Sequence, residues 1–311
     1  MDDALKAICP ACLGAEGADL EMVSVAEQHA RYAPNDPAMQ RRLTEEASRS
    51  STVYTLRRCG RCGLEYCVPM IAPKSAWYGL AYEALDLYPA ERWEYDCLLA
   101  RVTGADRLFE IGCGNGEFLK LCRDKGIDAW GADFSTAAVE ECKAAGLDVI
   151  VLEVGDTPVQ AERKATVSTA FQVLEHLDQP GKLFEHAAHA TTPDATLWVA
   201  IPSNRRPTRL FGETDFLDQP PHHMTRWTEP ALREIGSRFG WRLDELLYEP
   251  LGIRAALWWI ASHDGFHRPA NPMLAKFVRL LGYPAALVRR KSDLRLMSGF
   301  TMLGKFRKFI L

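Results

Sequence analysis

Three glycines at alternate positions follow a short apolar segment and are the first residues whose spacing indicates chemistry. They are Gly112, Gly114 and Gly116, in the stretch Phe109-Glu110-Ile111-Gly112-Cys113-Gly114-Asn115-Gly116. Glycine permits sharp backbone turns and leaves room for a ligand that a Cβ atom would block. Further along, Asp133 ends the apolar segment Gly131-Ala132-Asp133, and its carboxylate could accept hydrogen bonds from a ribose diol. Together these residues predict a pocket for an adenosine-containing cofactor.

The residues beside the glycines distinguish two kinds of cofactor. A dinucleotide-binding loop has the pattern G-x-G-x-x-G, whose last glycine or alanine allows close packing around a pyrophosphate. Here that position is Glu117, a carboxylate that would repel phosphates, and the spacing is G-x-G-x-G. Glu110 precedes the first glycine and suits a cationic group, such as the α-amino group of S-adenosylmethionine. The residues therefore favour S-adenosylmethionine over a dinucleotide.

This stretch resembles the first motif of class I S-adenosylmethionine-dependent methyltransferases. The resemblance continues through Phe171-Gln172-Val173-Leu174-Glu175-His176-Leu177 and Ile201-Pro202-Ser203-Asn204 and covers roughly residues 100–250. It implies that Asp133 holds the ribose, that Phe134 flanks the adenine, and that Asp156 contacts the adenine. It also implies that the methionine part lies against the Gln172 backbone, Glu110 and the loop residues Gly112, Cys113, Gly114, Asn115 and Gly116.

Four of the nine cysteines form two C-x-x-C pairs, Cys9 with Cys12 and Cys59 with Cys62. Each pair can bring two thiolates to within about 3.5 to 4 Å, as tetrahedral zinc requires. A redox pair would need a thioredoxin-like β-α-β context, which is missing here, and four unconnected cysteines are the other alternative. We expect a structural zinc site. A zinc ribbon ahead of a methyltransferase core resembles a group that includes sugar C-methyltransferases and methyltransferases of cell-surface polysaccharide clusters.

Histidine is the obvious candidate for removing a proton from a methyl acceptor, because its pKa lies near neutrality. The segment Asp218-Gln219-Pro220-Pro221-His222-His223 follows the fifth expected strand and lies on the same sheet edge as the cofactor motifs. The resemblance implies a histidine base in this loop, but two adjacent histidines leave its identity open. His176 is a third candidate. Alternatively, it is a turn residue that starts the next helix and has no direct role.

The remaining histidines and an arginine group are less informative. His186 and His189 are expected on a solvated helix face, and no supporting partner accompanies His29, His263 or His267. Aromatic residues in segment 76–103 are expected to pack on the core, although one of Tyr78, Tyr82 or Tyr88 could contact cofactor or acceptor. Three arginines could bind an acceptor phosphate or form a surface cluster, namely Arg205, Arg206 and Arg209.

Composition limits the classes of partner. With 311 residues, 47% apolar and 25% charged residues and a net charge of −4, the chain resembles a soluble protein and not a general nucleic-acid binder. From Arg268 onward there are ten basic residues and one acid, so this end carries +9 and the remainder −13 (−4 minus 9). The basic end could favour an anionic substrate or a membrane surface, or form a solvated helical face. With no apolar run of membrane-spanning length and no secretory leader pattern, a cytoplasmic location is expected.

Strands alternating with helices predict an α/β fold with a parallel sheet. The resemblance implies that this is the Rossmann-like, seven-stranded sheet of class I methyltransferases. Strands are expected at 107–112, 129–133, 148–152, 166–171, 196–201, 241–248 and 299–305. The resemblance implies that the last of them is antiparallel to its neighbours. The expected organisation is a zinc-ribbon-like module at 1–75 with a helical insertion over 20–50, a core at 76–248, and a helical insertion at 249–298. Residues 299–311 would hold the last strand and a basic tail. The insertion at 249–298 could be an acceptor lid, a homodimer interface or a membrane-surface patch.

The sequence thus predicts methyl transfer from S-adenosylmethionine to a small polar acceptor. The first choice is a nucleotide-linked sugar or a precursor of a glycan or natural product. One alternative is a scaffold that binds the cofactor without turnover. Another is a protein or RNA methyltransferase that docks through the zinc module, although the low net charge counts against RNA.

Overall fold

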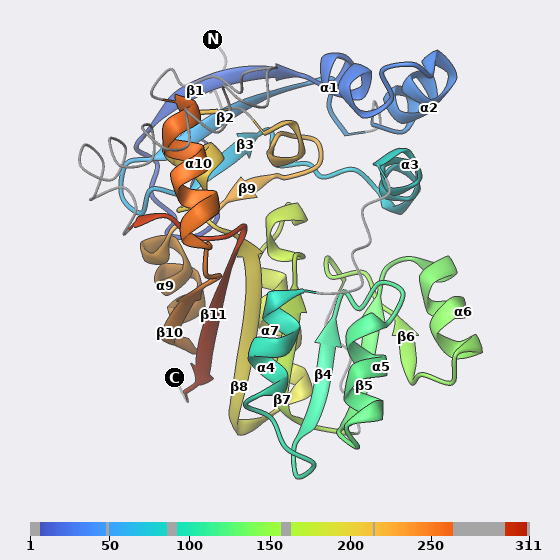
Figure 1. Cartoon of the computed structure of the whole chain (residues 1–311). Helices are drawn as coiled ribbons and strands as arrows, with labels where there is room; N and C mark the ends of the chain where they lie inside the picture. Colours follow the sequence, from blue (N-terminus) through green and yellow to red (C-terminus); the bar gives the residue numbers. More distant parts are fainter. Residues whose placement is uncertain are drawn as a thin grey trace, which may run out of the picture.

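The computed structural model describes residues 7–47, 50–85, 92–156, 163–213, 215–263 and 296–309. Two sheets organise them, a larger one in the lower half of Figure 1 and a smaller one above it. The larger sheet has the strand order β10-β11-β8-β7-β4-β5-β6. Its strands are β4 (Arg107–Ile111), β5 (Asp128–Asp133), β6 (Val149–Val151), β7 (Ala165–Phe171), β8 (Thr191–Pro202), β10 (Trp241–Tyr248) and β11 (Thr301–Lys308).

The larger sheet is mostly parallel. Strands β8, β7, β4, β5 and β6 pair in parallel, whereas β11 is antiparallel to both β8 and β10. This confirms the predicted Rossmann-like, seven-stranded sheet with an antiparallel last strand. The carboxyl ends of β4, β5 and β7 lie at one edge, where parallel α/β sheets bind their ligands.

Alternating side chains along the strands build two separate cores. Leu108 and Trp198 pack with α4 (Trp93–Leu99) and α5 (Glu117–Asp124). Their neighbours Phe109 and Val199 pack with α7 (Gly181–Ala190) and α9 (Glu229–Arg238). Helix α6 (Thr136–Ala144) packs beside β5 and β6. Most residues of the central strands β4, β5 and β7 are therefore buried, which fixes the sheet edge that carries the motifs.

The smaller sheet has the order β1-β2-β3-β9. It comprises β1 (Gly17–Ser24), β2 (Val53–Cys59), β3 (Glu65–Val68) and the short β9 (Thr225–Arg226). The first three strands come from the N-terminal region, but β9 follows directly after His222 and His223. The loop from Asp218 to His223, called the histidine loop below, is thus joined through β9 to the N-terminal sheet.

Three helices of the N-terminal region pack against one another: α1 (Val25–Tyr32), α2 (Pro37–Ala47) and α3 (Ser75–Leu85). Their apolar side chains form one cluster around Leu43, Tyr54 and Trp77, which Met224 from the histidine loop joins. The prediction of a helical insertion is correct for α1 and α2 but wrong for residues 20–24. Those residues belong to β1, because they pair with β2 along its length.

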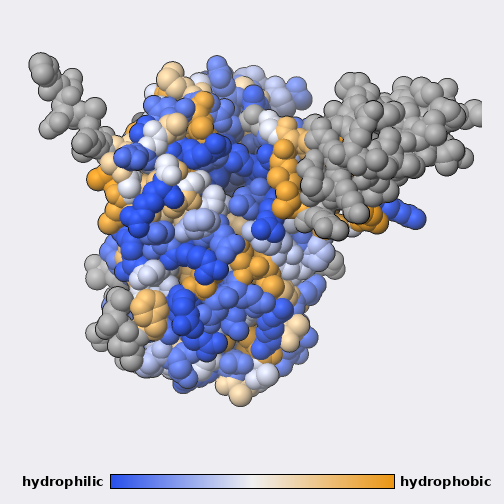
Figure 2. Space-filling view, turned by 90° about the vertical axis from the view of Figure 1, so that its left-hand side faces the viewer, coloured by the Kyte–Doolittle hydropathy of each residue, from blue (hydrophilic) through white to orange (hydrophobic). Residues whose placement is uncertain are grey.

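The insertion after β10 begins with α10 (Ile253–His263). Residues 264–295, with His267 and seven of the ten basic residues from Arg268 onward, lie outside the described part of the chain. In the described part, no helix has the length and apolar character needed to cross a membrane. Figure 2 shows a face on which polar residues predominate and apolar residues gather in smaller patches.

Candidate functional site

The glycine loop leaves β4 with three residues in the left-handed region, Gly112 (φ 75°), Gly114 (φ 52°) and Gly116 (φ 78°). Two of these glycines are also required by packing. A Cβ atom on Gly112 would lie 2.5 Å from Cγ2 of Val173, and one on Gly116 would lie 2.5 Å from Cδ1 of Leu147. The loop therefore needs glycine both for its bends and for its close contact with neighbouring elements.

Asp133, at the end of β5, fixes the middle of this loop. Its Oδ2 atom accepts a hydrogen bond of 2.8 Å from the Gly114 amide, and its Oδ1 accepts one of 2.8 Å from the Ser135 amide. Burial nevertheless raises the pKa of this carboxyl group. Each oxygen keeps a further lone pair that could accept from a hydroxyl group. Asp133 can thus shape the loop and bind a ribose at the same time.

Glu110 carries an unsatisfied carboxylate on β4. The residue is 2% exposed, and its Oε2 atom has no hydrogen-bond partner among the described residues. Burial raises its pKa to about 8, and Asp133 adds to the effect while Arg92 opposes it. A buried acidic group without a partner is costly unless a donor or cation reaches it. The site therefore fits a ligand that presents a cationic amino group, as S-adenosylmethionine does.

The other expected cofactor residues lie around these two acids. Cys113 is buried, Asn115 is half-buried in the loop, and Phe134 follows Asp133. Gln172 has a φ of 55°, and its side-chain amide donates to Glu94 (3.3 Å) and to Thr301 (3.4 Å). Its backbone remains at the carboxyl end of β7, while its side chain is turned toward α4 and β11.

Asp156 is exposed and lies in the turn after β6. His186 on α7 donates through its Nε2 atom to the carbonyls of Val154 (3.1 Å) and Asp156 (3.2 Å). The expectation of a solvated His186 is therefore wrong, since this residue is 4% exposed and fastens the turn. His189 is exposed, as expected.

Three histidines from two segments come together beside this edge. His176 ends the 3-10 turn η1 (Leu174–His176) after β7, and His222 and His223 precede β9. The ring centroids of His176 lie 4.9 Å from His222 and 4.8 Å from His223, and the latter two lie 4.8 Å apart. The structure thus places all three predicted catalytic candidates in one cluster.

Each of these histidines uses its Nδ1 atom in a hydrogen bond. His176 Nδ1 lies 2.7 Å from the His222 carbonyl, His222 Nδ1 lies 3.0 Å from the Leu217 carbonyl, and His223 Nδ1 lies 3.1 Å from Oδ1 of Asp218. Carbonyl and carboxylate oxygens only accept, so Nδ1 carries the proton in each ring. Burial lowers the pKa of His222 to about 3 and also lowers that of His176. These two rings are neutral near pH 7, with a lone pair on Nε2.

Asp218 links the histidine loop to the N-terminal sheet. It ends the turn η2 (Phe216–Asp218) and forms ion pairs with Arg206 and, at 3.2 Å, with Nε of Arg226. Arg226, on β9, also pairs with Glu65 on β3 at 3.0 Å. This buried chain of charges runs from β3 to His223 and holds the imidazole ring in place.

The three arginines proposed for an acceptor phosphate are engaged elsewhere. Arg206 pairs with Asp218, Arg209 lies 2.8 Å from Glu65, and the guanidinium of Arg205 lies 3.9 Å from the Tyr248 ring centroid. A cavity of about 30 Å³ lies beside Arg206 and Arg209, lined in part by Asn204 and Trp227. It has room for one water molecule and is too small for a nucleotide sugar.

Tyr78 on α3 connects the two halves of the site. Its ring meets Phe134 edge-on at 5.8 Å and His176 edge-on at 5.4 Å. Its hydroxyl donates to the carbonyls of His176 (3.4 Å) and His222 (3.5 Å). Of the three tyrosines suggested for a ligand contact, Tyr78 thus lies between Phe134 and the histidine cluster, whereas Tyr88 lies outside the described residues.

His29 has partners that the sequence did not reveal. It is fully buried, accepts a hydrogen bond of 3.0 Å from Nε1 of Trp77, and contacts the Thr44 hydroxyl at 2.9 Å through Nδ1. The expectation that His29 has no supporting partner is therefore wrong, and its role is to join α1, α2 and α3.

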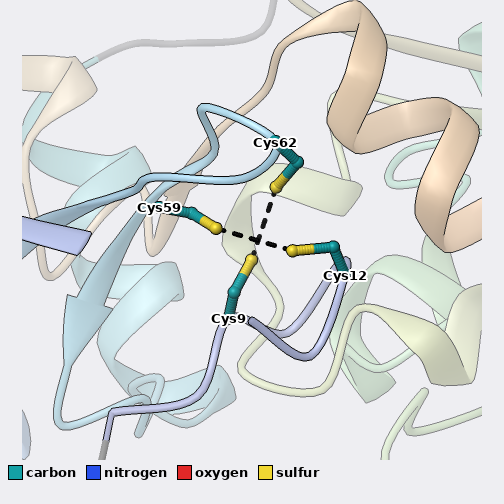
Figure 3. A group of neighbouring side chains, drawn as sticks. All are labelled: Cys9, Cys12, Cys59 and Cys62. Carbon is teal, nitrogen blue, oxygen red and sulfur yellow. Dashed lines mark hydrogen bonds between the residues drawn. The ribbon is translucent and has the colours of Figure 1, made fainter. Parts of the chain in front are cut away.

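The two cysteine pairs converge on one point, with all four sulfur atoms directed inward (Figure 3). The Sγ atoms of Cys9 and Cys62 lie 3.5 Å apart, as do those of Cys12 and Cys59, and all four lie within 4.8 Å of one another. Tetrahedral zinc with Zn–S bonds of about 2.3 Å places its sulfur atoms roughly 3.8 Å apart. The four thiols are buried and unbridged, so the donor set fits zinc.

The two knuckles share one backbone geometry. The Cys9 amide donates to the carbonyl of Gly14 (3.0 Å), and the Cys59 amide donates to that of Leu64 (2.8 Å). The fourth residue after the first cysteine of each pair is left-handed, namely Leu13 (φ 61°) and Gly63 (φ 74°). The cluster packs in the same core as Trp227 and α9, so the cysteine module is continuous with the core of the larger sheet.

The sheet order and the glycine-acid site define a Rossmann-like methyltransferase domain. Residues 79–246, more than half of the chain, match the methyltransferase-domain family, and the chain belongs to that family. S-adenosylmethionine is the cofactor that this assignment supports. A comparison with curated proteins found no match.

A comparison with solved structures found similar chains at low sequence identity. A SAM-dependent methyltransferase from Archaeoglobus fulgidus is 16% identical, with 69% of this chain and 91% of that chain covered and a TM-score of 0.47. A putative methyltransferase from Haloferax volcanii, in complex with the Trm112 activator, is 20% identical, with 69% and 88% covered and a TM-score of 0.47. A third, from Mesorhizobium loti, is 13% identical, with 71% and 98% covered and a TM-score of 0.46.

Proposed function

We propose that this protein transfers a methyl group from S-adenosylmethionine to a small polar acceptor bound at the histidine cluster. A nucleotide-linked sugar or a precursor of a glycan or natural product is the first candidate. The observation that carries the proposal is the pairing of His223 with Asp218, on a loop beside the sheet edge that holds the glycine motif. The resemblance of a zinc ribbon before such a core to sugar C-methyltransferases supports the choice of acceptor.

On the cofactor side, Glu110 would face the amino group, Asp133 the ribose hydroxyls and Phe134 the adenine. When bound, S-adenosylmethionine supplies a sulfonium methyl group that an acceptor atom can attack. The protein's task is to exclude water from this edge and to align the acceptor, which lowers the barrier by fixing proximity and direction. The buried tyrosine Tyr78, between Phe134 and His176, would form part of the wall.

His223 is the strongest candidate for the proton acceptor. Its Nδ1–H donates to Asp218, which leaves the Nε2 lone pair to take a proton from the acceptor. Asp218 would stabilise the resulting imidazolium, because two arginines keep the carboxylate ionised. His222 is more deeply buried, and its low pKa makes its Nε2 a weaker base. His176 would support the cluster through its bond to the His222 carbonyl.

The four cysteines would hold a structural zinc ion that fixes β2 and β3. Through Glu65 and Arg226, this module would position the loop that carries His223. The zinc ion would thus orient the site and take no part in the chemical step.

The proposal is tested by incubating the full chain with S-adenosylmethionine and a panel of acceptors that includes nucleotide sugars. We expect release of S-adenosylhomocysteine that depends on one acceptor class and falls strongly in His223→Ala. Release of no product with any acceptor, despite cofactor binding, would favour a non-catalytic scaffold. Product formation only with proteins or RNA would contradict the choice of acceptor.

A further inference from the structure

The histidine cluster has the arrangement of a metal-binding site, separate from the four cysteines. One ring nitrogen from each of His176, His222 and His223 lies within 4.8 Å of the other two. The three residues come from η1 and from the loop before β9, and both segments are held by backbone hydrogen bonds. The Met224 amide donates to the Glu175 carbonyl at 2.8 Å, which joins the two segments directly.

The hydrogen bonds of the three rings favour coordination through Nε2. Each Nδ1–H group donates to an oxygen atom, two of them backbone carbonyls and the third the carboxylate of Asp218. Metal-binding histidines almost always donate their second ring N–H in this way, which fixes the tautomer and the ring orientation. The Nε2 atom of His222 is buried and has no hydrogen-bond partner among the described residues.

Glu175 places a buried carboxyl group beside the same rings. It is 1% exposed, and neither of its carboxylate oxygens accepts a hydrogen bond within the described part of the chain. Its Oε1 atom lies 4.0 Å from Nε2 of His176. An isolated buried carboxylate beside neutral imidazoles is unfavourable, and a cation among these groups would compensate it.

We propose that His176, His222 and His223 bind a divalent transition-metal ion through their Nε2 atoms, with Glu175 as a fourth ligand or as its counter-charge. Imidazole ligands suit zinc, iron, nickel and copper, whereas magnesium and calcium prefer oxygen. Binding of this ion does not depend on methyl transfer. The ion would occupy the Nε2 lone pair of His223, so ion binding and proton uptake by His223 exclude each other. Transition-metal ions are therefore expected to inhibit the reaction proposed above.

Metal stoichiometry of the full chain tests the proposal. After dialysis against Zn²⁺ and removal of free ion, elemental analysis should find two zinc ions per wild-type chain. His222→Ala and His176→Ala should each retain one, held by the cysteines. His189→Ala is the matched control, because this exposed histidine lies outside the cluster, and it should retain two. Asp218→Asn, which alters the partner of His223, should weaken the second ion about 10- to 100-fold.

Cobalt substitution gives a readout that needs no variant. Co²⁺ bound by cysteines shows intense thiolate-to-metal charge transfer, whereas a second equivalent bound by histidines should add weaker d–d bands without it. One ion per wild-type chain with only the thiolate spectrum would overturn the proposal. Two ions per chain in wild type and also in both histidine variants would overturn it as well, if circular dichroism shows that the variants are folded. Both outcomes are read from ion binding alone, whether or not the chain releases S-adenosylhomocysteine, so a failure of the metal site can be told from a failure of methyl transfer.

Discussion

The carboxylate of Asp218 lies 3.1 Å from Nδ1 of His223, and both residues are tied to the N-terminal sheet through Arg226. Burial raises the pKa of Asp218, but the hydrogen bond with His223 and the neighbouring Arg206 and Arg226 outweigh it and hold the pKa below its usual range. The aspartate therefore stays ionised and can orient the ring. A region that looks like a separate module in the sequence thus helps to build the proposed active site.

The first prediction concerns this pair. His223→Ala should lower the turnover number about 10²- to 10⁴-fold, the usual contribution of a general base, and leave the affinity for S-adenosylhomocysteine within a factor of two or so. Turnover is measured by S-adenosylhomocysteine release and affinity by calorimetry. His222→Ala tests the neighbouring ring, and His189→Ala is the control. If both loop variants keep full activity, the loop does not supply the base.

Asp133→Ala should weaken S-adenosylhomocysteine binding about 10- to 100-fold, because hydrogen bonds to a charged group contribute about 1.5 to 3 kcal/mol. It should also loosen Gly114, whose amide donates to this carboxylate. The exposed Asp124→Ala at the end of α5 is the matched control and should bind like wild type. Calorimetric titration measures the affinity of both variants for S-adenosylhomocysteine. Unchanged affinity in a folded Asp133→Ala protein would remove the ribose assignment.

The buried Glu110 predicts a pH-dependent stability. Burial raises its pKa from 4.5 to about 8, so the ligand-free folded state holds this proton more tightly than the unfolded chain. Its contribution to stability is present below about pH 4.5 and is lost as the pH rises through about 8. Glu110→Gln mimics the protonated form, so it should match wild type near pH 5 and unfold at a higher temperature near pH 9.

Comparing wild type with Glu110→Gln isolates the contribution of Glu110 to stability, because the other buried groups titrate alike in both proteins. The difference in melting temperature is measured by circular dichroism between pH 5 and pH 9. The same variant should bind S-adenosylhomocysteine more weakly, since it lacks the negative charge for the amino group. A wild-type protein that is the more stable of the two at pH 9 would contradict this account of Glu110.

Loss of one knuckle cysteine should destabilise the whole chain rather than the N-terminal region alone. The four cysteines share a core with Trp227 and α9, and zinc binding in small zinc domains is worth about 10 to 16 kcal/mol. Cys59→Ser should therefore lose one zinc ion and lower the melting temperature by about 10 °C or more. Cys97→Ser, away from the cluster, is the control. A single unchanged unfolding transition in Cys59→Ser would argue against a structural zinc ion.

Much of the fold could be predicted from the sequence, because its strands are short apolar runs bounded by glycine and other turn residues. Gly112, Gly114 and Gly116 indicated the first bend, and Asp133 indicated the end of the next strand. The segment 20–24 was predicted as helical and is a strand, since its pairing partner, β2, lies far along the chain. Local patterns do not contain such long-range pairing.

The site residues that depend on tertiary contacts were harder to predict. Asp218 stood in the quoted motif, but its pairing with His223 arises only when η2 folds back over the loop. Glu65 was not identified from the sequence, because two of its three arginine partners, Arg209 and Arg226, lie more than a hundred residues away. His186 was misjudged for a similar reason, since the carbonyls that it binds come from another turn. The convergence of His176 on His222 likewise required the fold.

The most direct test of the central claim is a calorimetric titration of the purified chain with S-adenosylhomocysteine and, separately, with NADH. The glycine loop with Glu110 and Asp133 predicts saturable binding of one S-adenosylhomocysteine per chain and no measurable binding of NADH. Tight binding of NADH with no response to S-adenosylhomocysteine would contradict the account.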